Sequence, residues 1–105
     1  MLVKNIEIPT EKVAEFCQRW PVAELALFGS VLRDDFRPDS DIDILVSLLP
    51  EPRLTLFKLV QMEEELKLIF GRDVDLVCKE AIEKSLNYLR RKAILSSYEV
   101  IYVRA

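Results

Sequence analysis

Short apolar runs alternate along this chain with longer segments in which apolar residues recur at helical spacing, and this alternation limits the possible folds most. The strand-like runs cover residues 22–28, 41–48, 72–78 and 98–103, and the helix-like segments cover residues 10–20, 54–70 and 80–94. A sheet with helices packed against it follows from this order. We therefore predict a mixed α+β fold in one domain, residues 1–105, with the pairing direction of the last strand left open.

Each helical segment carries an apolar stripe that should face the core. In the first segment the stripe is Val13, Phe16, Cys17 and Trp20. In the second it is Leu56, Leu59, Met62, Leu66 and Ile69, with Gly71 as the expected C-cap. In the third it is Ile82, Leu86, Leu89 and Ala93. The basic residues Arg90, Arg91 and Lys92 would fall in the last turn of that helix, where the dipole favours cations, and a contact with phosphate or an acidic partner is the alternative.

The composition excludes several kinds of chemistry. The chain has no histidine, which rules out Ser-His and Cys-His catalysis and argues against zinc. Cys17 and Cys78 are far apart in sequence and are expected to be small core residues. A net charge of −3 argues against direct binding of nucleic acid. No apolar run suggests a signal peptide or a membrane span, so a cytoplasmic protein is expected.

Acidic residues two apart occur in two of the predicted strands. Asp41 and Asp43 would point to one face of their strand, and Asp73 and Asp75 to one face of theirs. If the strands are neighbours, three carboxylates can meet at one point, where they would repel one another unless cations lie between them. Magnesium prefers such oxygen ligands and shares them with substrate phosphates. Either pair alone is more typical of an exposed acidic strand end that has no function.

Gly29-Ser30 follows the first predicted strand and precedes a short helix or turn over residues 30–35. A glycine there lets a phosphate approach the backbone, and a helix N-terminus favours negative charge. A simple tight turn with Ser30 as N-cap is the alternative.

The spacing of these features resembles a known family. Gly29-Ser30, ten intervening residues and Asp41-Ile42-Asp43 resemble the G-S-x10-D-x-D signature of the DNA-polymerase-β-like nucleotidyltransferases, in the form found in minimal nucleotidyltransferase (MNT) domains. The resemblance extends from residue 22 to residue 103 and implies the small mixed sheet of that fold. Leu32 and Asp34 depart from the family, since many relatives carry a small residue and a glycine there.

The resemblance also implies roles for individual residues. Asp41, Asp43 and, from the VDLV run, Asp75 would bind metal and act as the catalytic residues, with Asp73 as the competitor for the third position. Gly29 and Ser30 would bind the triphosphate. Arg33 either reaches phosphate or pairs with Asp34, Asp35 or Asp39.

The activity implied is nucleotide transfer with Mg²⁺, through two ions, and ATP as the donor. MNT proteins are commonly encoded beside HEPN-domain proteins, so the resemblance implies an antitoxin that transfers AMP to a tyrosine of a HEPN ribonuclease toxin, in a homo- or hetero-oligomer. A transferase for small molecules of the aminoglycoside type and an antitoxin that only binds are the alternatives. The lack of a recognisable acceptor domain in 105 residues favours a protein acceptor.

Overall fold

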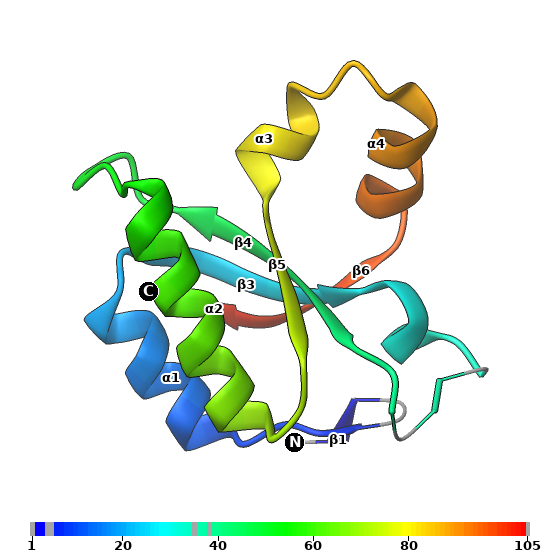
Figure 1. The fold of residues 1–105 in the computed structure, drawn as a ribbon, viewed down its shortest axis with the longest axis horizontal. Helices are drawn as coiled ribbons and strands as arrows, with labels where there is room; N and C mark the ends of the chain where they lie inside the picture. The colour runs from blue at the N-terminus through cyan, green and yellow to red at the C-terminus, as the bar shows by residue number, and fades with distance from the viewer. Residues whose placement is uncertain (1, 4–5, 35, 38, 105) are drawn as a thin grey trace.

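A four-stranded mixed sheet forms the centre of the molecule (Figure 1). The computed structural model describes residues 2–3, 6–34, 36–37 and 39–104. The strands are β3 (Val22–Phe28), β4 (Ile42–Leu48), β5 (Val74–Cys78) and β6 (Tyr98–Val103), in the order β5-β4-β3-β6. β5 is parallel to β4, and the other pairs are antiparallel. The predicted mixed fold is confirmed, and the last strand pairs antiparallel to β3 as an edge.

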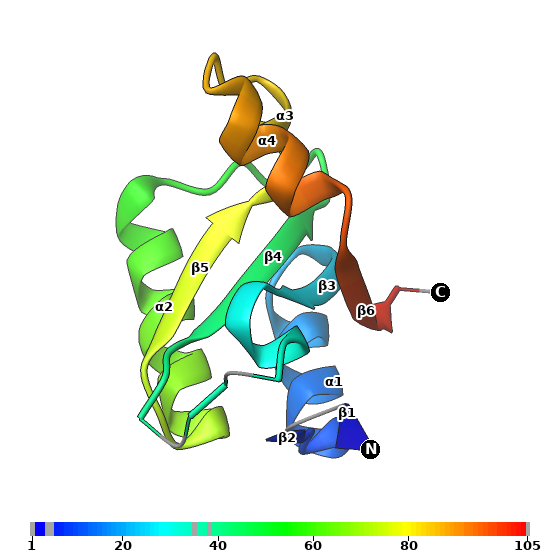
Figure 2. The same cartoon turned by 90° about the vertical axis from the view of Figure 1, so that its right-hand side faces the viewer.

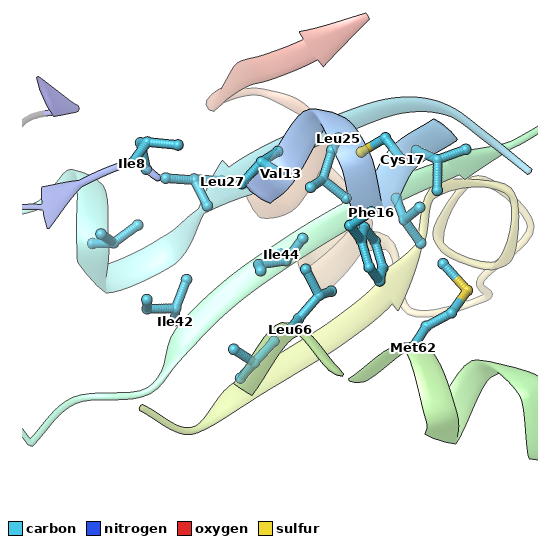
Figure 3. Packing of buried hydrophobic residues seen from close by; sticks show 14 of the residues in the cluster. Ile8, Val13, Phe16, Cys17, Leu25, Leu27, Ile42, Ile44, Met62 and Leu66 are labelled. Atoms are coloured by element: carbon cyan, nitrogen blue, oxygen red, sulfur yellow. The ribbon is translucent and has the colours of Figure 1, made fainter. Parts of the chain in front are cut away.

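One face of the sheet is closed by α1 (Thr10–Arg19) and α2 (Leu56–Phe70). Apolar side chains of β3, β4 and β5 that point to this face meet the buried stripes of the two helices (Figure 3). The fully buried members with the largest side chains include Phe16, Leu25, Leu27, Ile42, Ile44, Met62 and Leu66. Cys17 belongs to this cluster, as expected, and burial raises the pKa of its thiol to about 12. Cys78 is only half-buried at the margin of the cluster.

The opposite face carries a smaller apolar cluster. Ala26, Phe28 and Leu45 pack there against Ile82 of α3 (Lys79–Glu83) and Ile94 of α4 (Tyr88–Leu95). These two short helices stand at one end of the sheet and leave the rest of this face uncovered (Figures 1 and 2). Because the cover is partial, polar side chains on this face can reach solvent.

The prediction of one helix over residues 80–94 is wrong. The chain breaks between α3 and α4, where the Ser85 hydroxyl accepts a hydrogen bond from the Asn87 N–H and the Asn87 side chain caps α4 by accepting from the Arg90 N–H. Such local side-chain bonds compete with a continuous helix. The break turns Leu86, Leu89 and Ala93 toward solvent, although all three were expected in the core.

The break also moves the basic run. Arg90 and Arg91 lie in the first half of α4, not in the last turn of a long helix, and only Lys92 reaches the last turn. The helix dipole therefore does not account for the run as a whole.

Other element ends shift slightly from the prediction. α2 begins at Leu56, because the Thr55 side chain accepts a hydrogen bond from the Lys58 N–H as its N-cap, and Leu56 is exposed rather than buried. Gly71 is the left-handed C-cap of α2, as predicted. The turn after β3 is the single 3₁₀ turn η1 (Gly29–Leu32). A two-residue pairing of β1 (Leu2–Val3) with β2 (Ile6–Glu7) was not predicted, since strands this short leave no periodic signal.

Arg104 joins the end of the chain to the end of α1. Its guanidinium donates to the backbone carbonyls of Cys17 (2.5 Å), Trp20 (3.0 Å) and Val22 (2.8 Å). The last carbonyls of a helix lack partners within the helix, and a planar cation with several donors satisfies them well. Within the part of the chain that the structure describes, no helix is long and apolar enough to cross a membrane.

Candidate active site

The carboxylates of the predicted site lie on the partly covered face of the sheet. Asp43 in β4 is in register with Asp75 in β5 on one side and with Phe28 in β3 on the other. Residues paired in register on adjacent strands, about 4.8 Å apart, point to the same face. Asp43 and Asp75 are therefore neighbours on the face that α3 and α4 leave open.

Phe28 leads directly into the Gly29 turn, and this brings the turn against Asp43. Gly29 has a φ of 74°, a left-handed conformation that glycine adopts without strain. A Cβ added there would overlap the Asp43 Oδ2 atom and would lie 3.2 Å from Asp43 Cγ. The close approach of the turn to this carboxylate therefore requires glycine at position 29.

The surroundings of Asp43 concentrate negative charge. Burial raises the pKa of its carboxyl, and the carboxylates of Asp75 and Asp41 raise it further. A hydrogen bond from the Ser30 backbone N–H and the nearby Arg33 guanidinium oppose this rise in pKa. Asp43 is thus the centre of the predicted site. Each of the other five predicted site residues interacts with it electrostatically or through a hydrogen bond, or lies in the adjoining turn.

Asp41 and Asp73 both precede their strands and are exposed. The carboxylate of Asp41 acts on Asp43, whereas that of Asp73 acts on Lys67 of α2. Asp73 also accepts a hydrogen bond from the Ile42 N–H through its backbone carbonyl (2.9 Å). Its side chain lines a different cavity, of about 500 Å³, together with Lys67 and Arg72. The structure therefore brings Asp75 to Asp43 and directs Asp73 elsewhere.

The donor set suits a hard cation, but the ligands do not form a closed cage. Across the described ranges, no group of three or more histidine, cysteine, aspartate or glutamate side chains is arranged to hold a metal ion by itself. Like charges repel, and magnesium normally takes further ligands from water and substrate phosphates. Burial and then the neighbouring Asp75 and Asp41 carboxylates raise the pKa of Asp43, and three carboxylates fit Mg²⁺ in chemistry.

A cavity of about 190 Å³ adjoins the Gly29 turn. It is lined by Gly29, Leu32 and Arg33 from the turn and by Ala93 and Ser97 from the end of α4 and the residues after it. Ala93 and Ser97 were not predicted as site residues, because the sequence pattern placed Ala93 in the core of a continuous helix. Leu32, a departure from many relatives, fills part of this wall. Of the residues suggested as partners of Arg33, Asp35 lies outside the described residues.

Comparison with known proteins agrees with this geometry. A family model for the nucleotidyltransferase domain matches residues 10–101. The chain belongs to the nucleotidyltransferase domain family. The protein adenylyltransferase MntA of Thermococcus cleftensis is 36% identical to it over 104 residues, which cover 98% of this chain and 97% of that protein. This nucleotidyltransferase is thus similar to a curated enzyme from end to end.

Solved structures share the fold of this nucleotidyltransferase. A chain of a toxin–antitoxin complex with AMP-PNP matches with a TM-score of 0.69 at 19% identity, covering 92% of this chain and 75% of that one. Another match is a chain of the complex between a tri-AMPylated HEPN toxin of Shewanella oneidensis and an MNT antitoxin. Its TM-score is 0.59 at 20% identity, and the match covers 90% of this chain and 70% of that one. At these identities the matches show the fold alone.

Proposed function

We propose that this chain is a Mg²⁺-dependent protein adenylyltransferase that transfers AMP from ATP to a tyrosine of a HEPN-domain toxin and so acts as its antitoxin. The observation that carries the proposal is the contact between the Gly29-Ser30 turn and Asp43, with Asp75 and Asp41 beside it. A turn suited to phosphate and a cluster suited to cations then adjoin, as the transfer of a nucleotide from a triphosphate requires.

Asp41, Asp43 and Asp75 would hold the magnesium, and Gly29, Ser30 and Arg33 would bind the triphosphate. Bound magnesium supplies charge neutralisation for the attacking and leaving oxygens of such a transfer. In the reaction the acceptor hydroxyl oxygen would bond to the α-phosphorus, the bond from the α-phosphorus to the bridging oxygen would break to release pyrophosphate, and the hydroxyl proton would pass to water. Because the Ser30 N–H donates to Asp43, the Ser30 hydroxyl and the Arg33 guanidinium would orient the phosphates.

The choice of a protein acceptor rests on the relatives. The relative that this chain matches over nearly its whole length is named a protein adenylyltransferase. A structural neighbour is an MNT antitoxin bound to a HEPN toxin that carries AMP groups. We extend both properties to this chain as part of the proposal, together with ATP as the donor and a cytoplasmic location.

The test is the intact mass of a HEPN-domain protein offered as the acceptor. After incubation with this protein, ATP and Mg²⁺, we expect a mass increase of one or more AMP groups on a tyrosine. The increase should be absent with Asp41→Asn or Asp43→Asn and should persist with Glu11→Gln, an exposed acidic control on α1. EDTA should abolish it, which tests the need for metal.

Two outcomes would contradict the proposal in different ways. An unchanged mass with toxin neutralisation that survives both substitutions would identify an antitoxin that acts by binding alone. An unchanged mass with ATP-dependent modification of small hydroxyl compounds would identify a small-molecule transferase.

A further inference from the structure

The break between α3 and α4 exposes apolar and basic side chains side by side. Leu86 is 100% exposed and Leu89 is 77% exposed. Lys84, Arg90 and Lys92 are exposed next to them in sequence. We call these five residues the α3–α4 surface. Tyr88, 57% exposed, lies between the two leucines in sequence, so these apolar side chains form a patch rather than scattered single residues. Exposed apolar patches with a polar rim mark interaction sites.

Charge is distributed unevenly between this surface and the rest of the molecule. Residues 84–92 contain four basic residues and no acidic one, whereas the remainder of the chain contains eleven basic and eighteen acidic residues. Among the described residues, no carboxylate lies within 4.0 Å of the charged groups of Lys84, Arg90 or Lys92. Arg91 differs, because it donates to the Ser85 carbonyl (2.9 Å) and so holds the break in place. Lys92 lies 5.9 Å from the centroid of the exposed Tyr88 ring, a contact that does not neutralise its charge, so all three cations remain available to an acidic partner.

The surface leads to the active site. Leu89, Lys92 and Ala93 follow one another along one side of α4, at the spacing of neighbours on a helix. Ala93 lines the cavity that also contains Gly29. Since α4 has 8 residues, its whole length is about 12 Å. A protein held at Leu89 can thus place a side chain near Asp43, on the same face of the sheet.

A second exposed apolar stripe, on α2, lacks this connection. Leu56, Phe57, Val60 and Leu68 are exposed there. However, α2 covers the opposite face of the sheet from Asp43 and Asp75. A partner bound to that stripe would be separated from the carboxylates by the sheet itself.

We propose that the α3–α4 surface is the docking site for the protein acceptor, and that the acceptor contacts it with an acidic surface around an apolar centre. This inference rests on the proposed function and adds the place and chemistry of recognition. Opposite charges would steer the encounter, while the two leucines would lose their water shell in the complex. Tyr88 is the aromatic side chain of this stretch, and the Arg91 and Lys92 side chains lie 5.6 Å and 5.9 Å from its ring centroid. An RNA partner fits less well, because single-stranded RNA stacks its bases on aromatic faces and this ring already has two cations against it.

The test measures the affinity of the purified HEPN-domain partner for variants of the full chain. Leu89→Asp should weaken binding about tenfold or more, as expected for a central interface residue. The double variant Arg90→Glu with Lys92→Glu should also weaken binding about tenfold, and its remaining affinity should depend less on salt than that of the wild type. AMP transfer at subsaturating partner should fall in parallel, whereas the affinity for AMP-PNP should stay within twofold of the wild type.

Matched controls lie on α2. Leu68 is 84% exposed, so Leu68→Asp introduces the same change at an equally exposed leucine, and Lys58→Glu reverses an exposed basic charge. Both controls should bind the partner within about twofold of the wild type. Equal weakening by Leu68→Asp and Leu89→Asp, or no weakening by the α3–α4 variants, would overturn the proposal.

Two further outcomes separate the possible failures. Absence of AMP transfer by the wild type, with partner binding lost in the α3–α4 variants, would overturn the proposed function and keep the docking surface. The wild type can also be tested with a fluorescent 20-nucleotide RNA. If it binds this RNA and the charge-reversed double variant does not, while the affinity for the partner protein is unchanged, the surface binds nucleic acid and the proposal of an acceptor site is overturned.

Discussion

Replacing Gly29 with alanine tests whether the turn must approach Asp43. Gly29 and Gly71 both have left-handed backbones, with φ of 74° and 70°. An alanine in this conformation costs about 1–2 kcal/mol of stability. At Gly71 nothing lies within 4 Å of an added Cβ, so Gly71→Ala should show this backbone cost alone.

Gly29→Ala adds a collision to the same backbone cost. The new Cβ would overlap Asp43 Oδ2, so the carboxylate must rotate and lose the hydrogen bond from the Ser30 N–H. A hydrogen bond to a charged group contributes about 1.5–3 kcal/mol. The total loss should therefore be roughly 2.5–5 kcal/mol, against about 1–2 kcal/mol for Gly71→Ala. Transfer should fall about a hundredfold in Gly29→Ala, since the displaced carboxylate no longer meets the turn.

Urea unfolding followed by circular dichroism measures the loss of stability in Gly29→Ala and in Gly71→Ala. A double-mutant cycle then tests whether the difference between the two losses comes from Asp43. In an Asp43→Ala background the nearest remaining atom of residue 43 is its Cβ, 3.5 Å from the added methyl group, which is ordinary contact. There the cost of Gly29→Ala should drop to that of Gly71→Ala. Equal costs for the two glycine variants in the wild-type background, with transfer retained in Gly29→Ala, would refute the reasoning.

Three further predictions concern the carboxylates and Arg104. Burial and then the Asp75 and Asp41 charges raise the pKa of Asp43, so the folded protein binds the Asp43 carboxyl proton more tightly than the unfolded chain does. The free energy of unfolding is therefore greatest below the ordinary carboxyl pKa, and it falls as pH rises through the pKa of Asp43 in the folded protein. Metal-free Asp43→Asn should therefore be more stable than wild type at pH 7 and no more stable at pH 3, as measured by urea unfolding in EDTA; a variant less stable at pH 7 would contradict this. Asp75→Asn should abolish AMP transfer while Asp73→Asn weakens it modestly in the same mass assay, and the reverse order would make Asp73 the third carboxylate. Arg104→Ala should lower stability by about 2–3 kcal/mol in thermal unfolding, since three backbone carbonyls lose their donor. Arg104→Lys should restore only part of this stability, because an ammonium lacks the planar fork of donors. An unchanged melting temperature in Arg104→Ala would show that these hydrogen bonds make no net contribution.

Local patterns predicted most of the sheet and two of the helices. The apolar runs became β3, β4 and β6 within one residue, and the core stripe of α1 is buried at Val13, Phe16 and Cys17. Periodicity failed for residues 80–94, where apolar spacing continues although Ser85 and Asn87 form local hydrogen bonds that end one helix and start the next. Hydrophobic spacing does not register a break made by side-chain bonds to the backbone.

The sequence by itself determined the chemistry of the site, because the Gly29-Ser30 turn and the Asp41-x-Asp43 pair are local features whose parity follows from strand geometry. Only the tertiary structure decided which distant residues join them. The parallel register of β4 with β5 places Asp75 beside Asp43, and the break before α4 both exposes Leu86 and Leu89 and brings Ala93 to the Gly29 cavity. Strand register depends on contacts between segments far apart in the chain, and no local pattern contains it. The helix break is made by local side-chain bonds, but hydrophobic spacing does not register them.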